Sequence, residues 1–153
     1  MQQIQVFDRL NIESIDSLPI QNIKIPFHLS NLIITDQFLN SHVTCRFIFG
    51  DNIIHKGFGG AAKLRNHPQA IGFITKKYPN NKTESFFTID EYLPIFNQEK
   101  MKLEYLITSK SHLYFLISKL GSGLANKNHI FENIIEPWLL SLEHKFKNVS
   151  LLF

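Results

Sequence analysis

The sequence predicts a layered α/β domain, and three observations support that prediction. Short apolar stretches alternate with amphipathic ones along the chain, as strands and helices alternate in an α/β fold. Two glycine-rich segments, residues 57–62 and 121–125, each stand between a predicted strand and a predicted helix. The 153 residues are 44% hydrophobic and 19% charged, which is enough for one core and predicts a single domain over residues 1–153.

The predicted strands are short and mostly apolar. Residues 1–30 hold apolar pieces broken by Pro19 and Pro26, which favours edge strands or loops there. A β-branched run follows at residues 32–35. The strands expected after it cover residues 43–49, 70–75, 85–89, 103–108, 113–118 and 149–153. The first of these is expected to end at the turn residues Gly50, Asp51 and Asn52.

Three helices are predicted between these strands. Residues 61–66 form a short helix that ends before a proline, because the residue preceding proline avoids the helical conformation. Residues 90–102 form a second helix, with Asp90 as its cap. Residues 130–146 form an amphipathic helix, in which Pro137 marks either a kink or the first turn of its second half.

The first glycine-rich segment follows the sequence Phe-Gly-Asp-Asn and is expected to bind an anion. Glycines let the backbone approach a ligand closely, and the helix that opens there offers unpaired amides and a positive dipole end. The candidate ligand-binding residues are Asn52, Gly57, Gly59, Gly60 and Ala61. Asp51 and Asn52 can hydrogen-bond hydroxyls or base edges and are the candidates for catalysis. A tight turn with an Asn or Asp cap is the alternative interpretation.

The second glycine-rich segment repeats the arrangement after the buried strand at 113–118. Its candidate ligand-binding residues are Ser118, Gly121, Ser122, Gly123 and Leu124. Because ligands of layered α/β folds bind beyond the carboxyl ends of the strands, both segments should lie on one rim and clamp a diphosphate.

Two cations between the glycine-rich segments are further candidates. Arg65 and Lys76 could neutralise a phosphate, although a solvated surface is the alternative for both. His55 is the one histidine considered as a functional candidate, since it lies in the first loop. Cys45 is expected to be a buried structural thiol.

These motifs resemble those of the macrodomain family. That family has an Asn at a strand end, then a glycine run and small residues that open a helix, matched here by Asn52, Gly57, Gly59, Gly60, Ala61 and Ala62. Its second loop wraps the diphosphate after a buried strand and is matched by Ile117, Ser118 and residues 121–124. The chain is also similar, over residues 43–146, to small phage and bacterial macro-like proteins with FGDN, GFGGAA and GSGLA motifs.

The resemblance implies a three-layer, macrodomain-like fold with a mixed central sheet flanked by helices. It implies a ligand, ADP-ribose or a related nucleotide, including an immune-signalling nucleotide that a phage protein would sequester as an anti-defence measure. Asp36 is then the candidate for the residue that contacts adenine. An enzyme that removes ADP-ribose or cleaves such a nucleotide is the alternative, with Asp51, Asn52 and His55 available to hold a water.

Composition argues against several other classes of function. A single cysteine excludes a disulfide framework, and the seven histidines show no metal-ligand spacing, so no metal or other cofactor is predicted. A net charge of +3 without a clustered basic stripe argues against nucleic acid as a partner. The expected partner is a small-molecule nucleotide, and a chain with no membrane span and no signal at its start is expected in the cytoplasm. A purely structural protein would leave both glycine-rich segments unexplained.

Overall fold

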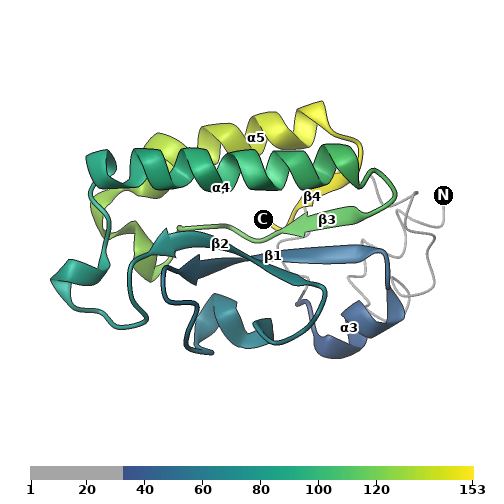
Figure 1. Cartoon of the computed structure of the whole chain (residues 1–153), viewed down its shortest axis with the longest axis horizontal. Helices are drawn as coiled ribbons and strands as arrows, with labels where there is room; N and C mark the ends of the chain where they lie inside the picture. The colour runs from purple at the N-terminus through teal and green to yellow at the C-terminus, as the bar shows by residue number, and fades with distance from the viewer. Residues whose placement is uncertain (1–32) are drawn as a thin grey trace.

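A four-stranded parallel sheet forms the centre of the computed structural model, which describes residues 33–153 (Figure 1). The strands lie in the order β2-β1-β3-β4. Their bounds are β1 Cys45–Asn52, β2 Ala70–Lys76, β3 Tyr114–Ile117 and β4 Val149–Leu151. Every pair of neighbours within these residues is parallel, where a mixed sheet was expected. The reason is that each of the first three strands is followed by a helical crossover that returns the chain to the same end of the sheet.

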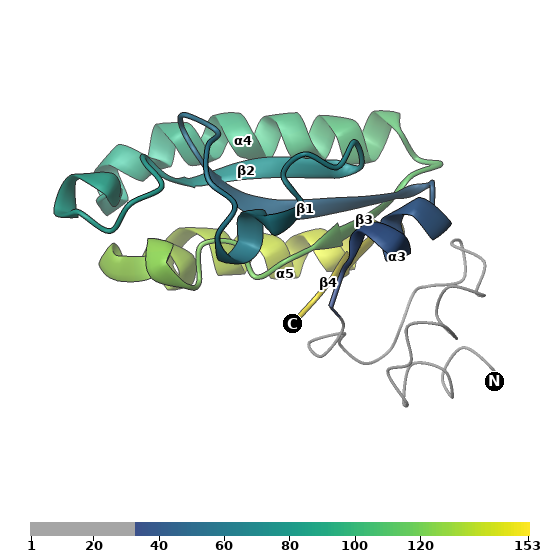
Figure 2. The same ribbon diagram turned by 90° about the horizontal axis from the view of Figure 1, so that it is seen from below.

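Helices cover both faces of the sheet, which gives three layers of unequal thickness. Two long helices, α4 at Ile89–Ser109 and α5 at Glu136–Lys145, lie on one face. The short α3 at Asp36–Ser41 and the 3-10 helix η2 at Gly60–Leu64 lie on the other. Figure 2 shows the same sheet from below, with α4 along the β2 side and α5 along the β4 side.

Two hydrophobic cores correspond to the two faces because successive side chains of a strand point to opposite sides. In β1, the side chain of Ile48 joins the larger core under α4 and α5, together with Phe73 of β2 and Phe115 of β3. Phe47 and Phe49 join the smaller core under α3 and η2. The strand is therefore buried on both faces, as its apolar sequence predicts.

The two edges of the sheet are closed by side chains from the covering helices. The Glu99 carboxylate of α4 accepts a hydrogen bond from the backbone N–H of Ile74 at 2.8 Å, and the Tyr92 hydroxyl donates to the Ile74 carbonyl at 2.6 Å. On the opposite edge, Glu143 of α5 accepts from the N–H of Leu151 at 2.9 Å. Unpaired edge groups would otherwise invite pairing with another chain.

The strands predicted at 85–89 and 103–108 are wrong. Residues 83–85 form the short 3-10 helix η3, and α4 runs unbroken from Ile89 to Ser109. Thr88, rather than Asp90, caps α4 in a reciprocal capping box with Glu91. The buried side chains of α4 recur every three or four residues, at positions 92, 96, 99, 103 and 107. This helical spacing continues through the region that was predicted as a strand.

Other differences are smaller. The run at 32–35 forms no strand over its described residues, and Thr35 caps α3, a helix that was not predicted. Gly50, Asp51 and Asn52 belong to β1 rather than to a turn. The predicted break at Pro137 is confirmed: a π-helical segment, Phe131–Ile135, gives way to α5, and the proline lies in the first turn of α5.

The edge strands or loops predicted for residues 1–30 lie outside the described residues. Among the helices that the structure describes, none combines the length and apolar character needed to cross a membrane.

Candidate functional site

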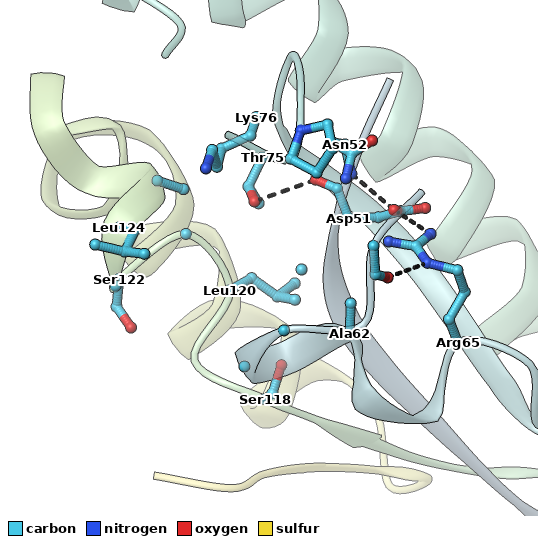
Figure 3. A pocket seen from close by; sticks show the side chains of 18 of the residues that line it. Asp51, Asn52, Ala62, Arg65, Thr75, Lys76, Ser118, Leu120, Ser122 and Leu124 are labelled. Carbon is cyan, nitrogen blue, oxygen red and sulfur yellow. Dashed lines mark hydrogen bonds and ion pairs between the residues drawn. The ribbon is translucent and has the colours of Figure 1, made fainter. Parts of the chain in front are cut away.

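A pocket of about 550 Å³ lies at the carboxyl ends of the strands (Figure 3). From β1 the chain crosses to β2 on one side, whereas from β3 it crosses to β4 on the other. The gap between the ends of β1 and β3 is therefore a topological switch point, where α/β sheets bind ligands. The pocket volume is in the range of small-molecule sites.

Most of the residues singled out from the sequence line this one pocket. They are Asp51, Asn52, Gly57, Gly59, Gly60, Arg65, Lys76, Ser118, Gly121, Ser122, Gly123 and Leu124. Ala61 lies in η2, between the lining residues Gly60 and Ala62. His55 and Asp36 are not among the lining residues, and Asp36 is the first residue of α3.

Asp51 is the electrostatic anchor of the first loop. Its side chain is 4% exposed, and its Oδ1 accepts hydrogen bonds from Arg65 Nη1 at 2.5 Å and from the Asn52 backbone N–H at 2.7 Å. Its Oδ2 lies 2.6 Å from Nδ1 of His55. Gly72 of β2 makes room for this carboxylate, because a Cβ at that position would overlap it.

Arg65 and Asn52 use their side chains to hold the backbone of the first loop. Arg65 Nε donates to the Gly57 carbonyl at 2.8 Å, and its Nη2 donates to the Lys56 carbonyl at 3.1 Å. Asn52 Nδ2 donates to the same Lys56 carbonyl at 2.8 Å. The side chains of Asp51 and Asn52, the two catalytic candidates, are thus engaged with their own loop in this structure.

The second loop is held by two serine hydroxyls. Ser118 Oγ donates to the Ile48 carbonyl of β1 at 2.9 Å, and Ser122 Oγ donates to the Lys119 carbonyl at 2.7 Å. Figure 3 shows this loop facing the Asp51–Asn52 strand end across the pocket. The two segments predicted to meet on one rim are therefore opposite walls of one cavity.

The five glycines of the loops fall into two kinds, and Gly57, Gly60 and Gly121 are those with a positive φ. Gly57 and Gly121 have φ values of +94° and +76°, a conformation that favours glycine, and a Cβ at Gly121 would come within 2.6 Å of the Ile135 side chain. Gly59 and Gly123 have negative φ values, and a Cβ at either would meet no protein atom within 4 Å. Packing within the described chain therefore requires glycine at neither of these positions, and both border the pocket.

Positive charge dominates the pocket wall. Its cations are Lys56, Arg65, Lys76 and Lys119, and its single acid is Asp51, which is already paired with Arg65. Partial burial lowers the pKa of the Lys76 ammonium below its usual value. An excess of cations around a cavity attracts an anionic ligand.

Other lining residues were not among the candidates for catalysis or ligand binding, although Ala62 and Ala125 belong to the two glycine-rich segments. These other residues are Gly50, Lys56, Ala62, Thr75, Pro79, Asn81, Lys119, Leu120 and Ala125. Lys56 precedes the first glycine segment directly and Lys119 lies two residues before the second, so adjacency to the loops was the available signal. Pro79 and Asn81 come from the turn after β2, which only the fold brings to the pocket.

The comparisons with known proteins give a family. A model of the family of unknown function DUF7831 matches residues 29–129, about two thirds of the chain. The chain belongs to DUF7831. In this DUF7831 member the matched stretch contains β1, β2, β3 and both glycine loops, and it ends before α5 and β4. Neither the curated proteins nor the solved structures provide a match.

Proposed function

We propose that the pocket binds a nucleotide through its diphosphate, with ADP-ribose or a related nucleotide, including an immune-signalling one, as the ligand. The observation that carries the proposal is the cationic cavity between two glycine-rich loops at the switch point of a parallel sheet. Backbone amides of glycine-rich turns and lysine ammoniums are both suited to phosphate oxygens. The macrodomain resemblance remains a prediction that adds the adenine and ribose to this ligand.

Gly59 and Gly123 give a second, independent line of support for the same proposal. Both positions have a negative φ, and the packing of the described chain calls for glycine at neither. A ligand that lies close against the backbone would supply the missing reason, because a side chain would occupy its place.

Titration calorimetry of the full chain with ADP-ribose tests the proposal, with a thermal melt of the same samples. We expect measurable heat and a melting temperature that rises with ligand concentration, since the ligand stabilises the folded state by mass action. Gly59→Val and Gly123→Val should keep the melting temperature of the free protein and lose binding.

Gly121→Val is the matched control. Its side chain would meet Ile135, so this variant should lower the melting temperature even without ligand. A wild-type chain that gives no heat with ADP-ribose or other adenine nucleotides at millimolar concentration would rule the proposal out. Normal binding by both Gly59→Val and Gly123→Val would place the ligand elsewhere.

A hydrolase is the second candidate, and it is favoured by one contact between the pocket-lining residue Asp51 and His55, which is not itself a lining residue. The buried Asp51 carboxylate holds Nδ1 of His55, whose side chain is 64% exposed, as a carboxylate orients a general base. Incubation with ADP-ribosylated protein, followed by mass spectrometry, would detect released ADP-ribose. If the activity exists, His55→Ala should lower turnover far more than affinity.

A further inference from the structure

Thr75 carries a hydroxyl whose hydrogen-bonding capacity is largely unused. Three hydroxyl side chains line the pocket, and those of Ser118 and Ser122 donate to backbone carbonyls at 2.9 Å and 2.7 Å. Within residues 33–153, Thr75 Oγ1 has a single partner, the Asp51 carbonyl, at 3.5 Å. That distance is at the outer limit of a hydrogen bond and contributes little.

Burial makes this weak pairing costly. Thr75 is 3% exposed, so its hydroxyl has little access to bulk water. Buried polar groups in folded proteins almost always have a good partner, because an unpaired one loses the free energy of its hydration. A buried hydroxyl with one long contact in a pocket wall therefore indicates a partner that enters the pocket.

The position of Thr75 places that hydroxyl between the two loops. Thr75 lies near the end of β2, beside the end of β1, where a Cβ at Gly50 would be 3.3 Å from its Oγ1. Its methyl group lies 3.5 Å from where a Cβ at Gly121 would be. Figure 3 shows Thr75 between Asp51 and the second loop, next to Lys76.

We propose that the Thr75 hydroxyl donates a hydrogen bond to an anionic oxygen of the ligand diphosphate; this inference rests on the proposed function. A phosphate oxygen is an acceptor only, so it takes the hydroxyl proton that the distant Asp51 carbonyl barely engages. Charge-assisted O–H···O⁻ bonds are the stronger class of hydrogen bond. The Lys76 ammonium on the adjacent residue draws an anion to the same wall of the pocket.

Two substitutions of Thr75 separate a ligand contact from a structural role. Thr75→Val keeps the shape of the side chain and removes the hydroxyl, whereas Thr75→Ser keeps the hydroxyl. Each is titrated by calorimetry with ADP-ribose and separately with inorganic pyrophosphate, and each is melted without ligand. We expect Thr75→Val to weaken both ligands by about 10- to 100-fold and Thr75→Ser to stay within a few-fold of wild type.

The melt without ligand supplies the independent readout. Because the Thr75 hydroxyl gains little from the folded chain, Thr75→Val should melt at the wild-type temperature or above it. A clearly lower melting temperature would show that the hydroxyl serves the fold, and the inference would fail.

The remaining outcomes are equally decisive. If the wild type binds and Thr75→Val binds as tightly, Thr75 makes no ligand contact, while the proposed function survives. Loss of ADP-ribose affinity without loss of pyrophosphate affinity would assign the hydroxyl to another part of the nucleotide and overturn the phosphate contact. If the wild type binds neither ligand, the proposed function fails and this inference fails with it.

Discussion

Arg65 is the residue that ties the first glycine loop to the sheet. Its guanidinium pairs with Asp51 on β1 and donates to two carbonyls of the loop, those of Lys56 and Gly57. The ring of Phe49 lies beneath it, 5.5 Å from the guanidinium carbon. A planar group with several donors suits this role in a way that a lysine ammonium does not.

Removing that guanidinium should cost much of the stability of the protein. Arg65→Met leaves the Asp51 carboxylate, 4% exposed, without its cation, and we expect the free energy of unfolding to fall by roughly 3–5 kcal/mol. Urea denaturation, monitored by the fluorescence of Trp138, the single tryptophan, measures this loss of unfolding free energy.

Arg46→Met is the matched control for this substitution. Arg46 also extends from β1, but its Nη1 donates only to two nearby carbonyls, so a loss below about 1 kcal/mol is expected. Adding Asp51→Asn to Arg65→Met should recover part of the stability, because it removes the unpaired charge. Equal stability of the two arginine variants would contradict the anchoring role.

Among the elements, β2 and α4 are linked by hydrogen bonds as well as by packing. β2 is an edge strand, and the Glu99 and Tyr92 side chains of α4 satisfy the outward backbone groups of Ile74. Burial raises the pKa of the Tyr92 phenol well above its usual value, so it remains a neutral donor. The helix thus both packs on the sheet and completes its hydrogen bonding.

Loss of the Glu99 acceptor should loosen β2. Glu99→Ala leaves the Ile74 N–H without its partner, and we expect the free energy of unfolding to fall by about 1–3 kcal/mol. Hydrogen exchange of the β2 peptide should also become faster. Glu99→Gln keeps a carbonyl oxygen at the same place and should retain most of the protection; if Ala and Gln behave alike, the edge contact is immaterial.

At the scale of the whole molecule, stability should fall at alkaline pH because of buried acids that include Cys45 and Tyr114 as well as Tyr92. Burial raises the pKa of the Cys45 thiol from 9.0 to about 12 and that of the Tyr114 phenol from 10.0 to about 12. The unfolded chain therefore ionises first as pH rises. Stability should be complete below pH 9 and fall between about pH 9 and 12, by up to about 1.4 kcal/mol per pH unit for each group.

Urea denaturation of the wild type and of Cys45→Ala between pH 7 and 10.5 tests this dependence. The slope of the free energy of unfolding against pH should be shallower in the variant above pH 9. Comparing slopes removes the packing cost of deleting the sulfur, since that cost is the same at every pH. In the native wild type, the thiol should also resist iodoacetamide at pH 8 and react once urea unfolds the chain. Parallel slopes in the two proteins would refute the assignment to Cys45.

Local sequence determined the features that depend on local chemistry. The strands β1 and β3 were recognisable because their largely apolar runs correspond to burial on both faces of the sheet. The break at Pro137 followed from the missing N–H of proline. The two glycine segments and the strand ends before them were sufficient to select ten residues that line one pocket, and the cations between the segments added Arg65 and Lys76.

Only the tertiary structure decided the features that depend on partners far along the chain. Residues 103–108 have a composition that suits strand or helix, and packing of Leu103 and Ile107 into the core under α4 selects the helix. The parallel direction of every strand follows from the crossovers rather than from any strand sequence.

Within the pocket, too, local sequence could not predict contacts with residues far along the chain. Asp51 was a candidate for catalysis in sequence, and its carboxylate binds Arg65, fourteen residues away, which no local pattern specifies. Thr75 was placed in a predicted strand but was not selected as a site residue, because a threonine in a strand is ordinary until the fold buries its hydroxyl beside a cavity. Residue types and spacing thus determined which segments line the pocket. Long-range contacts decided which of its side chains are already hydrogen-bonded to the protein, because those partners lie far along the chain.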